Sequence, residues 1–119
     1  MTINTAITEV QAICPHAYPD ETVTRWLSEL DGKLREEVVK DTSEPVKYIW
    51  PEDADTSLLA DHPHDDIYPA YILAMVDLCN RDTVRYANDM QVFNQKKEDY
   101  ACWYRRTHKS ASYSGWITL

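Results

Sequence analysis

Apolar residues recur every three or four positions in four segments of the chain, a spacing that gathers side chains on one face of a helix. These segments predict helices at about 3–14, 20–40, 66–80 and 83–108. Pro15 should end the first helix, because the residue before a proline disfavours helical geometry. Asp82 is well placed to cap the last one. Since only a few residues separate the last two helices, we expect them to be antiparallel neighbours.

The longest periodic stretch covers about residues 83–106 and contains neither Gly nor Pro. A helix of this length would measure about 36 Å, the width of a small domain. One side of it would carry Tyr86, Met90, Phe93, Lys97, Tyr100 and Tyr104. We therefore expect this helix to be the element on which the others pack. The preceding helix is apolar on all sides through Val76, so it should be the most buried.

The helical pattern is absent between the second and third helices. Pro45, Pro51 and Pro63 prevent a long helix here. Residues 46–50 alternate weakly and predict a short strand, while 56–60 fit a second strand or a helical turn. The segment is acidic and too long for a simple connection, so we expect an ordered loop with a binding role. Just before it, Gly32 interrupts the second helical pattern, which predicts a kink or a close backbone approach.

The last eleven residues, 109–119, are rich in serine and lack a helical period. They nevertheless retain Tyr113, Trp116 and Leu119. We interpret them as an extended C-terminal arm that docks on this protein or on a partner; a frayed terminus is the alternative. The predicted fold is all-α: a helical domain of about four helices over 1–108, with a long loop between the second and third, followed by the arm.

The composition fits one domain and argues against several classes of function. The chain has 119 residues and only two glycines, which argues against a Gly-rich phosphate loop. Its net charge is −8, with a balance of −11 over residues 1–80 and +3 over 81–119. An acidic body repels nucleic acid and anionic membranes. The basic end, which includes Arg105 and Arg106, is suited to an acidic partner or to the acidic half of another copy; the alternative is an ordinary solvated helix end.

Few residues suggest catalysis or ligand binding. Cys14, Cys79 and Cys102 fall in helical apolar patterns and are expected to be buried free thiols of a reducing compartment. His62 and His64, beside several carboxylates, form the one cluster with metal-ligand chemistry, but no further His stands at matching spacing. The interpretation that we favour is an ordinary turn with a helix N-cap at Asp65 or Asp66 and solvated histidines. We expect no enzyme activity, no cofactor and no metal.

The start of the chain and its longest apolar run bear on location. The first residues lack a basic segment followed by an apolar core, so no signal peptide is expected. The longest apolar run, at 67–76, is about half of what a membrane helix needs. We expect synthesis in a cytoplasm and no membrane partner.

Several segments of the chain form a recognisable set. They are Arg25–Gly32, Asp65–Tyr68, Tyr71–Ile72 with Asp77, Arg85–Asn88, Phe93–Asn94 and Tyr100–His108. Together these segments resemble small head–tail connector (adaptor) proteins of tailed bacteriophages. The similarity is one of pattern across about residues 5–108, and the tail after Lys109 has no counterpart in it.

The resemblance implies a structural virion protein at the head–tail interface, made in the bacterial host cytoplasm. Its subunits would assemble as a ring of about twelve copies under the portal protein and would present a surface to a stopper or tail-completion protein. A monomer in solution is compatible with this assembly, because the portal would act as the template. DNA would pass through the ring without specific binding, which suits an acidic wall. The alternatives are another head or tail completion protein, or an acidic inhibitor that mimics DNA.

Three regions are expected to make protein contacts in such an assembly. The first is the loop at 44–62, with Trp50. The second is the basic end at Arg105 and Arg106. The third is the arm, with Tyr113, Trp116 and Leu119.

Overall fold

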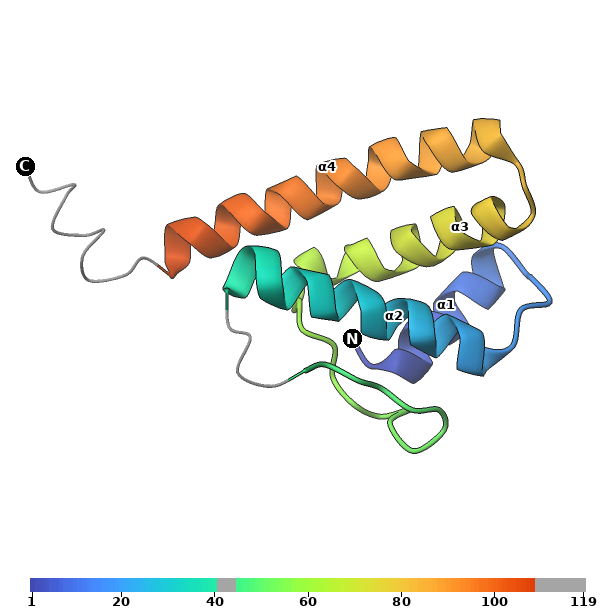
Figure 1. The fold of residues 1–119 in the computed structure, drawn as a ribbon, viewed down its shortest axis with the longest axis horizontal. Helices are drawn as coiled ribbons and strands as arrows, with labels where there is room; N and C mark the ends of the chain where they lie inside the picture. The colour runs from blue at the N-terminus through green and yellow to red at the C-terminus, as the bar shows by residue number, and fades with distance from the viewer. Residues whose placement is uncertain (41–44, 109–119) are drawn as a thin grey trace, which may run out of the picture.

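The computed structural model describes residues 1–40 and 45–108, and these residues form four α-helices. The helices are α1 (Ile3–Ile13), α2 (Asp20–Leu34), α3 (Ile67–Cys79) and α4 (Thr83–Thr107) (Figure 1). A five-residue π-helix, η1 (Arg35–Val39), continues α2, and a 3-10 turn, η2 (His64–Asp66), leads into α3. The prediction of an all-α fold with four helices is confirmed.

The strand predicted at 46–50 is wrong. Within the described residues the only β-type pairing is an isolated antiparallel bridge between Thr2 and Ser57. The backbone around Tyr48 bonds instead to Ser28 on α2, so it has no neighbouring strand with which to form a ladder.

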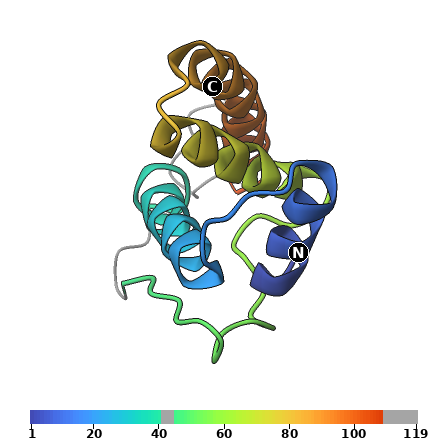
Figure 2. The same ribbon diagram turned by 90° about the vertical axis from the view of Figure 1, so that its right-hand side faces the viewer.

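Helix α3 lies at the centre of the bundle, which corrects the expectation that α4 is the central element. It contacts α1, α2 and α4. Its residues Ile67, Tyr68 and Ile72 are fully buried. Figure 2 shows α4 on one side of α3 and the two N-terminal helices on the other, with α3 and α4 running antiparallel as predicted.

Helix α4 packs mainly on α3, and this explains why its predicted stripe is only partly buried. Phe93 and Tyr100 are buried, with Ala101 beside them. Met90 and Tyr104 are half-buried. Because α1 and α2 cover the opposite face of α3, α4 has one packed side and one long solvated side.

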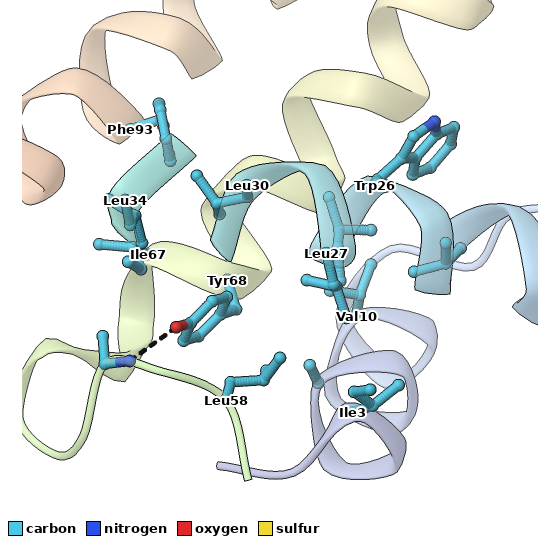
Figure 3. Close-up of a cluster of buried hydrophobic side chains, with 14 of the residues drawn as sticks. Ile3, Val10, Trp26, Leu27, Leu30, Leu34, Leu58, Ile67, Tyr68 and Phe93 are labelled. Carbon is cyan, nitrogen blue, oxygen red and sulfur yellow. Dashed lines mark hydrogen bonds between the residues drawn. The ribbon is translucent and has the colours of Figure 1, made fainter. Parts of the chain in front are cut away.

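The core is assembled from α1, α2, α3, the end of the loop and the packed side of α4. Figure 3 shows apolar side chains of these elements meeting around Tyr68, and the labelled ones are Ile3, Val10, Trp26, Leu27, Leu30, Leu34, Leu58, Ile67 and Phe93. Fully burying one such aliphatic or aromatic side chain stabilises the fold by about 1.5–3 kcal/mol. The core therefore depends on segments far apart in the sequence.

The structure also corrects the predictions for the cysteines and for Gly32. Cys79 and Cys102 are exposed and Cys14 is half-buried, so the prediction of buried thiols is wrong for two of the three. Cys79 ends α3 and Cys102 lies on the solvated side of α4. At Gly32, an added Cβ would meet no atom within 4 Å, so the close backbone approach considered for this residue is absent.

No helix in residues 1–40 and 45–108 is both long and apolar enough to span a membrane.

Candidate functional site

The loop between α2 and α3 is held in place by a buried carboxylate that the sequence did not single out. Asp31 on α2 has no exposed surface. Its Oδ1 accepts a hydrogen bond from the Tyr68 hydroxyl at 2.7 Å. Its Oδ2 accepts one from the Tyr48 hydroxyl at 2.6 Å and one from the Leu59 N–H at 3.0 Å. One side chain thus joins α2, α3 and both halves of the loop.

The tyrosines around Asp31 act as fixed donors. The Tyr68 oxygen also accepts the Ala60 N–H at 2.7 Å, the dashed line in Figure 3. Burial, followed by the charge of Asp31, raises the pKa of both Tyr68 and Tyr48 far above the ordinary tyrosine value. Burial also raises the pKa of Asp31, against the effect of its three hydrogen bonds. Both hydroxyls therefore stay protonated, and the cluster fastens the loop rather than exchanging protons.

The loop is also bonded to the start of α1. The Asn4 N–H donates to the Ala54 carbonyl at 2.9 Å and the Ile3 N–H to the Thr56 carbonyl at 3.3 Å. These are donors of the first helical turn, which have no partner within the helix. In return, the Leu58 N–H donates to the Met1 carbonyl at 2.9 Å. The turn at 50–55 is therefore fixed against the body of the protein.

This turn and the residue before it present one apolar and two acidic side chains to solvent. Ile49 is 51% exposed, and Glu52 and Asp55 are exposed. Trp50, a predicted contact residue, is half-buried and packs against the core. We call Ile49, Trp50, Glu52 and Asp55 the loop-turn patch.

A second candidate surface lies at the C-terminal end of α4. His108 stacks on Tyr104 with ring centroids 3.9 Å apart and planes 4° apart. The ring of His64, from η2, lies 5.0 Å from that of Trp103. Trp103 and Tyr104 are half-buried and His108 is exposed, so each keeps some surface available.

Arg105 and Arg106 flank these rings and are both exposed. Across residues 1–40 and 45–108, no carboxylate forms an ion pair with either guanidinium. Trp, Tyr and Arg are the residues that most often carry the binding energy of protein interfaces. We call Trp103, Tyr104, Arg105, Arg106 and His108 the α4-end patch.

A groove of about 440 Å³ runs between α2 and α4. Its apolar lining comes from Leu30, Tyr71, Met75, Tyr86, Met90 and Phe93. Beside it, Lys97 on α4 pairs with Glu37 on η1 at 2.6 Å. The groove thus combines adaptable methionines and aromatic rings with a charged margin, a lining suited to protein contacts.

A second hollow, of about 430 Å³, is acidic and lies between α1, α3 and α4. It includes Glu9, Asp65, Asp66 and Asp89. Lys96 pairs with Asp66 at 2.7 Å, and the N-terminal amine lies 3.7 Å from Asp65. Burial and the neighbouring Asp77 carboxyl raise the pKa of Asp89 to about 6.

His62 and His64, the two histidines considered as metal ligands, lie in different surroundings. His62 is 90% exposed at the side chain, whereas His64 packs among the rings of Tyr100 and Trp103. In the described part of the chain, no three His, Cys, Asp or Glu side chains are grouped so that they could hold a metal ion.

Of the six predicted contact residues, three are described by the structure. Trp50 lies in the loop-turn patch, and Arg105 and Arg106 lie in the α4-end patch. The other three, Tyr113, Trp116 and Leu119, lie outside the described residues. In both Figure 1 and Figure 2, α4 and the green turn of the loop lie on opposite sides of the molecule, so the structure does not bring the two patches together.

Sequence reasoning missed the Asp31 network and the ring cluster around His64. Asp31 did carry a signal, because it stands four residues after the buried Leu27, on the apolar face of α2. For His64 the sequence held no signal, since the antiparallel packing of α3 and α4 alone brings it to Trp103.

Comparisons with protein-family models, curated proteins and solved structures find no match to this chain.

Proposed function

We propose that this chain is a structural subunit of a tailed-bacteriophage virion, a head–tail connector (adaptor) that assembles as a ring under the portal and extends the DNA channel towards the tail. Residues 1–108 would be the connector domain and 109–119 an arm that contacts a neighbour. The sequence resemblance described above is the first support for this proposal.

The observation that carries the proposal furthest is the pair of patches on opposite sides of a small helical body. A subunit of a ring needs two different surfaces, one for each neighbour. The loop-turn patch is fixed by Asp31 and by the first turn of α1. The α4-end patch combines aromatic rings and arginines. Surfaces of this kind suit a protein whose work is docking.

The charge of the chain suits the same role. With a net charge of −8, the subunit would offer few cations to phosphates, so DNA would slide through such a ring without specific binding. The portal on one side and a stopper or tail-completion protein on the other would then be its partners in the virion.

Deleting the gene from the phage that encodes it tests the proposal. We expect DNA-filled heads and separate tails in electron micrographs, and tailed particles again when the gene is supplied in trans. Normal infectious virions from the deletion would contradict the proposal.

Mixing purified components separates a connector from a tail-completion protein. In one experiment, heads from the deletion strain are incubated with the purified protein, freed of excess protein and combined with untreated tails. In the other, the tails are treated and the heads are not. A connector restores joining when the heads were treated. Restoration only after treatment of the tails would favour the tail-completion alternative.

A further inference from the structure

We propose that the α4-end patch of one copy docks on the loop-turn patch of a second copy. This inference rests on the proposed function, since it names the surfaces by which subunits would meet. The occupant of each patch is thus another copy of this chain.

Opposite charge is the first argument for this pairing. Arg105 and Arg106 are exposed on one patch, and Glu52 and Asp55 are exposed on the other. Arginine is the cation best matched to a carboxylate, because its planar guanidinium binds both oxygens at once.

Several charges near these four residues are used within the chain. Lys96 pairs with Asp66, and Lys97 with Glu37. Asp53, inside the turn, accepts the Ile49 N–H at 2.8 Å. Among residues 1–40 and 45–108, no ion pair occupies Arg105, Arg106, Glu52 or Asp55, so these four groups are available at the two patches.

Apolar surface is the second argument. Ile49 is 51% exposed on the loop-turn patch, and Trp103 and Tyr104 retain partial exposure on the α4-end patch. An apolar anchor surrounded by matched charges is the usual anatomy of a protein interface. Both patches are held by internal contacts, which lowers the entropy lost on binding.

The positions of the patches make the contact intermolecular. They lie on opposite sides of the molecule (Figures 1 and 2), so one copy cannot satisfy its own arginines with its own loop. A contact between two different surfaces repeats from copy to copy, and it closes into a ring when the rotation fits.

Nucleic acid is a poorer occupant of the α4-end patch. Within residues 1–40 and 45–108 the patch offers two cations, and Glu98 and Asp99 lie exposed on the preceding turns of the same helix. Affinity for DNA grows with the number of phosphates that cations neutralise, so two arginines beside two acids bind it weakly.

The test uses two charge-reversed variants of the full chain. The first, R105E/R106E, makes the α4-end patch acidic. The second, E52R/D55R, makes the loop-turn patch basic. A control, R25E/R81E, changes the net charge as the first does, at two exposed positions outside both patches and outside the groove between α2 and α4. Unchanged thermal melts establish that each variant folds.

Self-association is measured by analytical ultracentrifugation at low ionic strength, up to about 1 mM protein, where contacts with millimolar Kd are detectable. Each variant alone should associate at least about tenfold more weakly than the unaltered protein, because its patches then carry like charges. The control should stay within about twofold.

The decisive measurement is made on a mixture of the two variants. An acidic α4-end patch then meets a basic loop turn, and the unaltered patches meet each other, so mixing should restore association in alternating order. An unaltered protein that stays monomeric, a mixture that stays dissociated, or a control that weakens equally would overturn the pairing. If the unaltered protein does not self-associate but binds a short DNA duplex, and R105E/R106E does not bind this duplex, the α4-end patch is assigned to nucleic acid instead.

The two proposals fail separately. If self-association is absent while the purified protein still joins heads to tails, this pairing is wrong and the connector function stands. If the mixture associates but the deletion phage is normal, the pairing stands and the connector function is wrong.

Discussion

Asp31 is the residue on which the loop most depends. It is a charged side chain in a fully buried position of α2, and it accepts bonds from residues 17, 28 and 37 positions away. A buried carboxylate is tolerated only when its oxygens are hydrogen-bonded. Here the bonds that satisfy the carboxylate also bring the loop to the body of the protein.

Replacing Asp31 by Asn should destabilise the protein by about 2–4 kcal/mol at pH 7.5, because an amide NH₂ would face buried donors that need an acceptor. Urea unfolding measures the free energy. The matched control is Glu29→Gln, the same chemical change at an exposed position of the same helix, with an effect below about 0.5 kcal/mol. Equal stability of the two variants would show that the network does not hold the loop.

Asp89 should make stability depend on pH. Its pKa is raised to about 6. Below its ordinary pKa of about 4 the carboxyl is protonated in both folded and unfolded states, so its contribution to stability is complete there. That contribution is lost as the pH rises through about 6, since the folded carboxyl must then ionise beside Asp77.

Asp89→Asn should therefore flatten the fall in unfolding free energy between pH 5 and pH 7.5, by about 1 kcal/mol once solvent screening is included. Urea unfolding at both pH values measures it. An unchanged slope would mean that Asp89 titrates normally in the folded protein.

At the scale of the elements, the periodic pattern predicted the four helices well. Thr2 and Asp82 cap α1 and α4 through their side chains. The pattern gave no sign of η1, because a π-helical turn depends on how α2 packs at its end and not on apolar spacing. It also misjudged which helix is central. The length of α4 led to the prediction that α4 is the central helix. The apolar surface on all sides of α3 instead lets α3 pack on each of the other three helices.

Gly32 offers a direct test of helix α2. An added Cβ would meet no atom within 4 Å, and alanine is the better helix former. Gly32→Ala should therefore raise the free energy of unfolding by about 0.5–1 kcal/mol. Lys33→Ala, at the next and exposed position, should change it by less than about 0.5 kcal/mol. A loss of stability in Gly32→Ala would mean that the helix needs the freedom of glycine at this point.

At the scale of the whole molecule, the sequence predicted candidate contact regions but not their arrangement. Trp50 and the arginine pair could be found from composition and position. Their placement on opposite sides follows from how α4 and the loop flank α3, which no local pattern encodes. The ring cluster of His64 and Trp103 was equally out of reach, because it joins residues 39 positions apart.

If oppositely charged patches join the copies, self-association should weaken as salt is added. Raising the ionic strength from about 0.05 to 0.5 M shortens the screening length severalfold and should weaken association about tenfold. Sedimentation at both salt concentrations measures this. Association that strengthens with salt would point to the apolar groove between α2 and α4 as the contact instead.

The central claim is that this helical body is a virion building block, and electron cryo-microscopy of purified particles tests it most directly. The account predicts a ring of about twelve copies between the portal and the tail, with the four helices fitting the density of each subunit. Complete virions in which neither the density nor mass spectrometry shows this chain would contradict it.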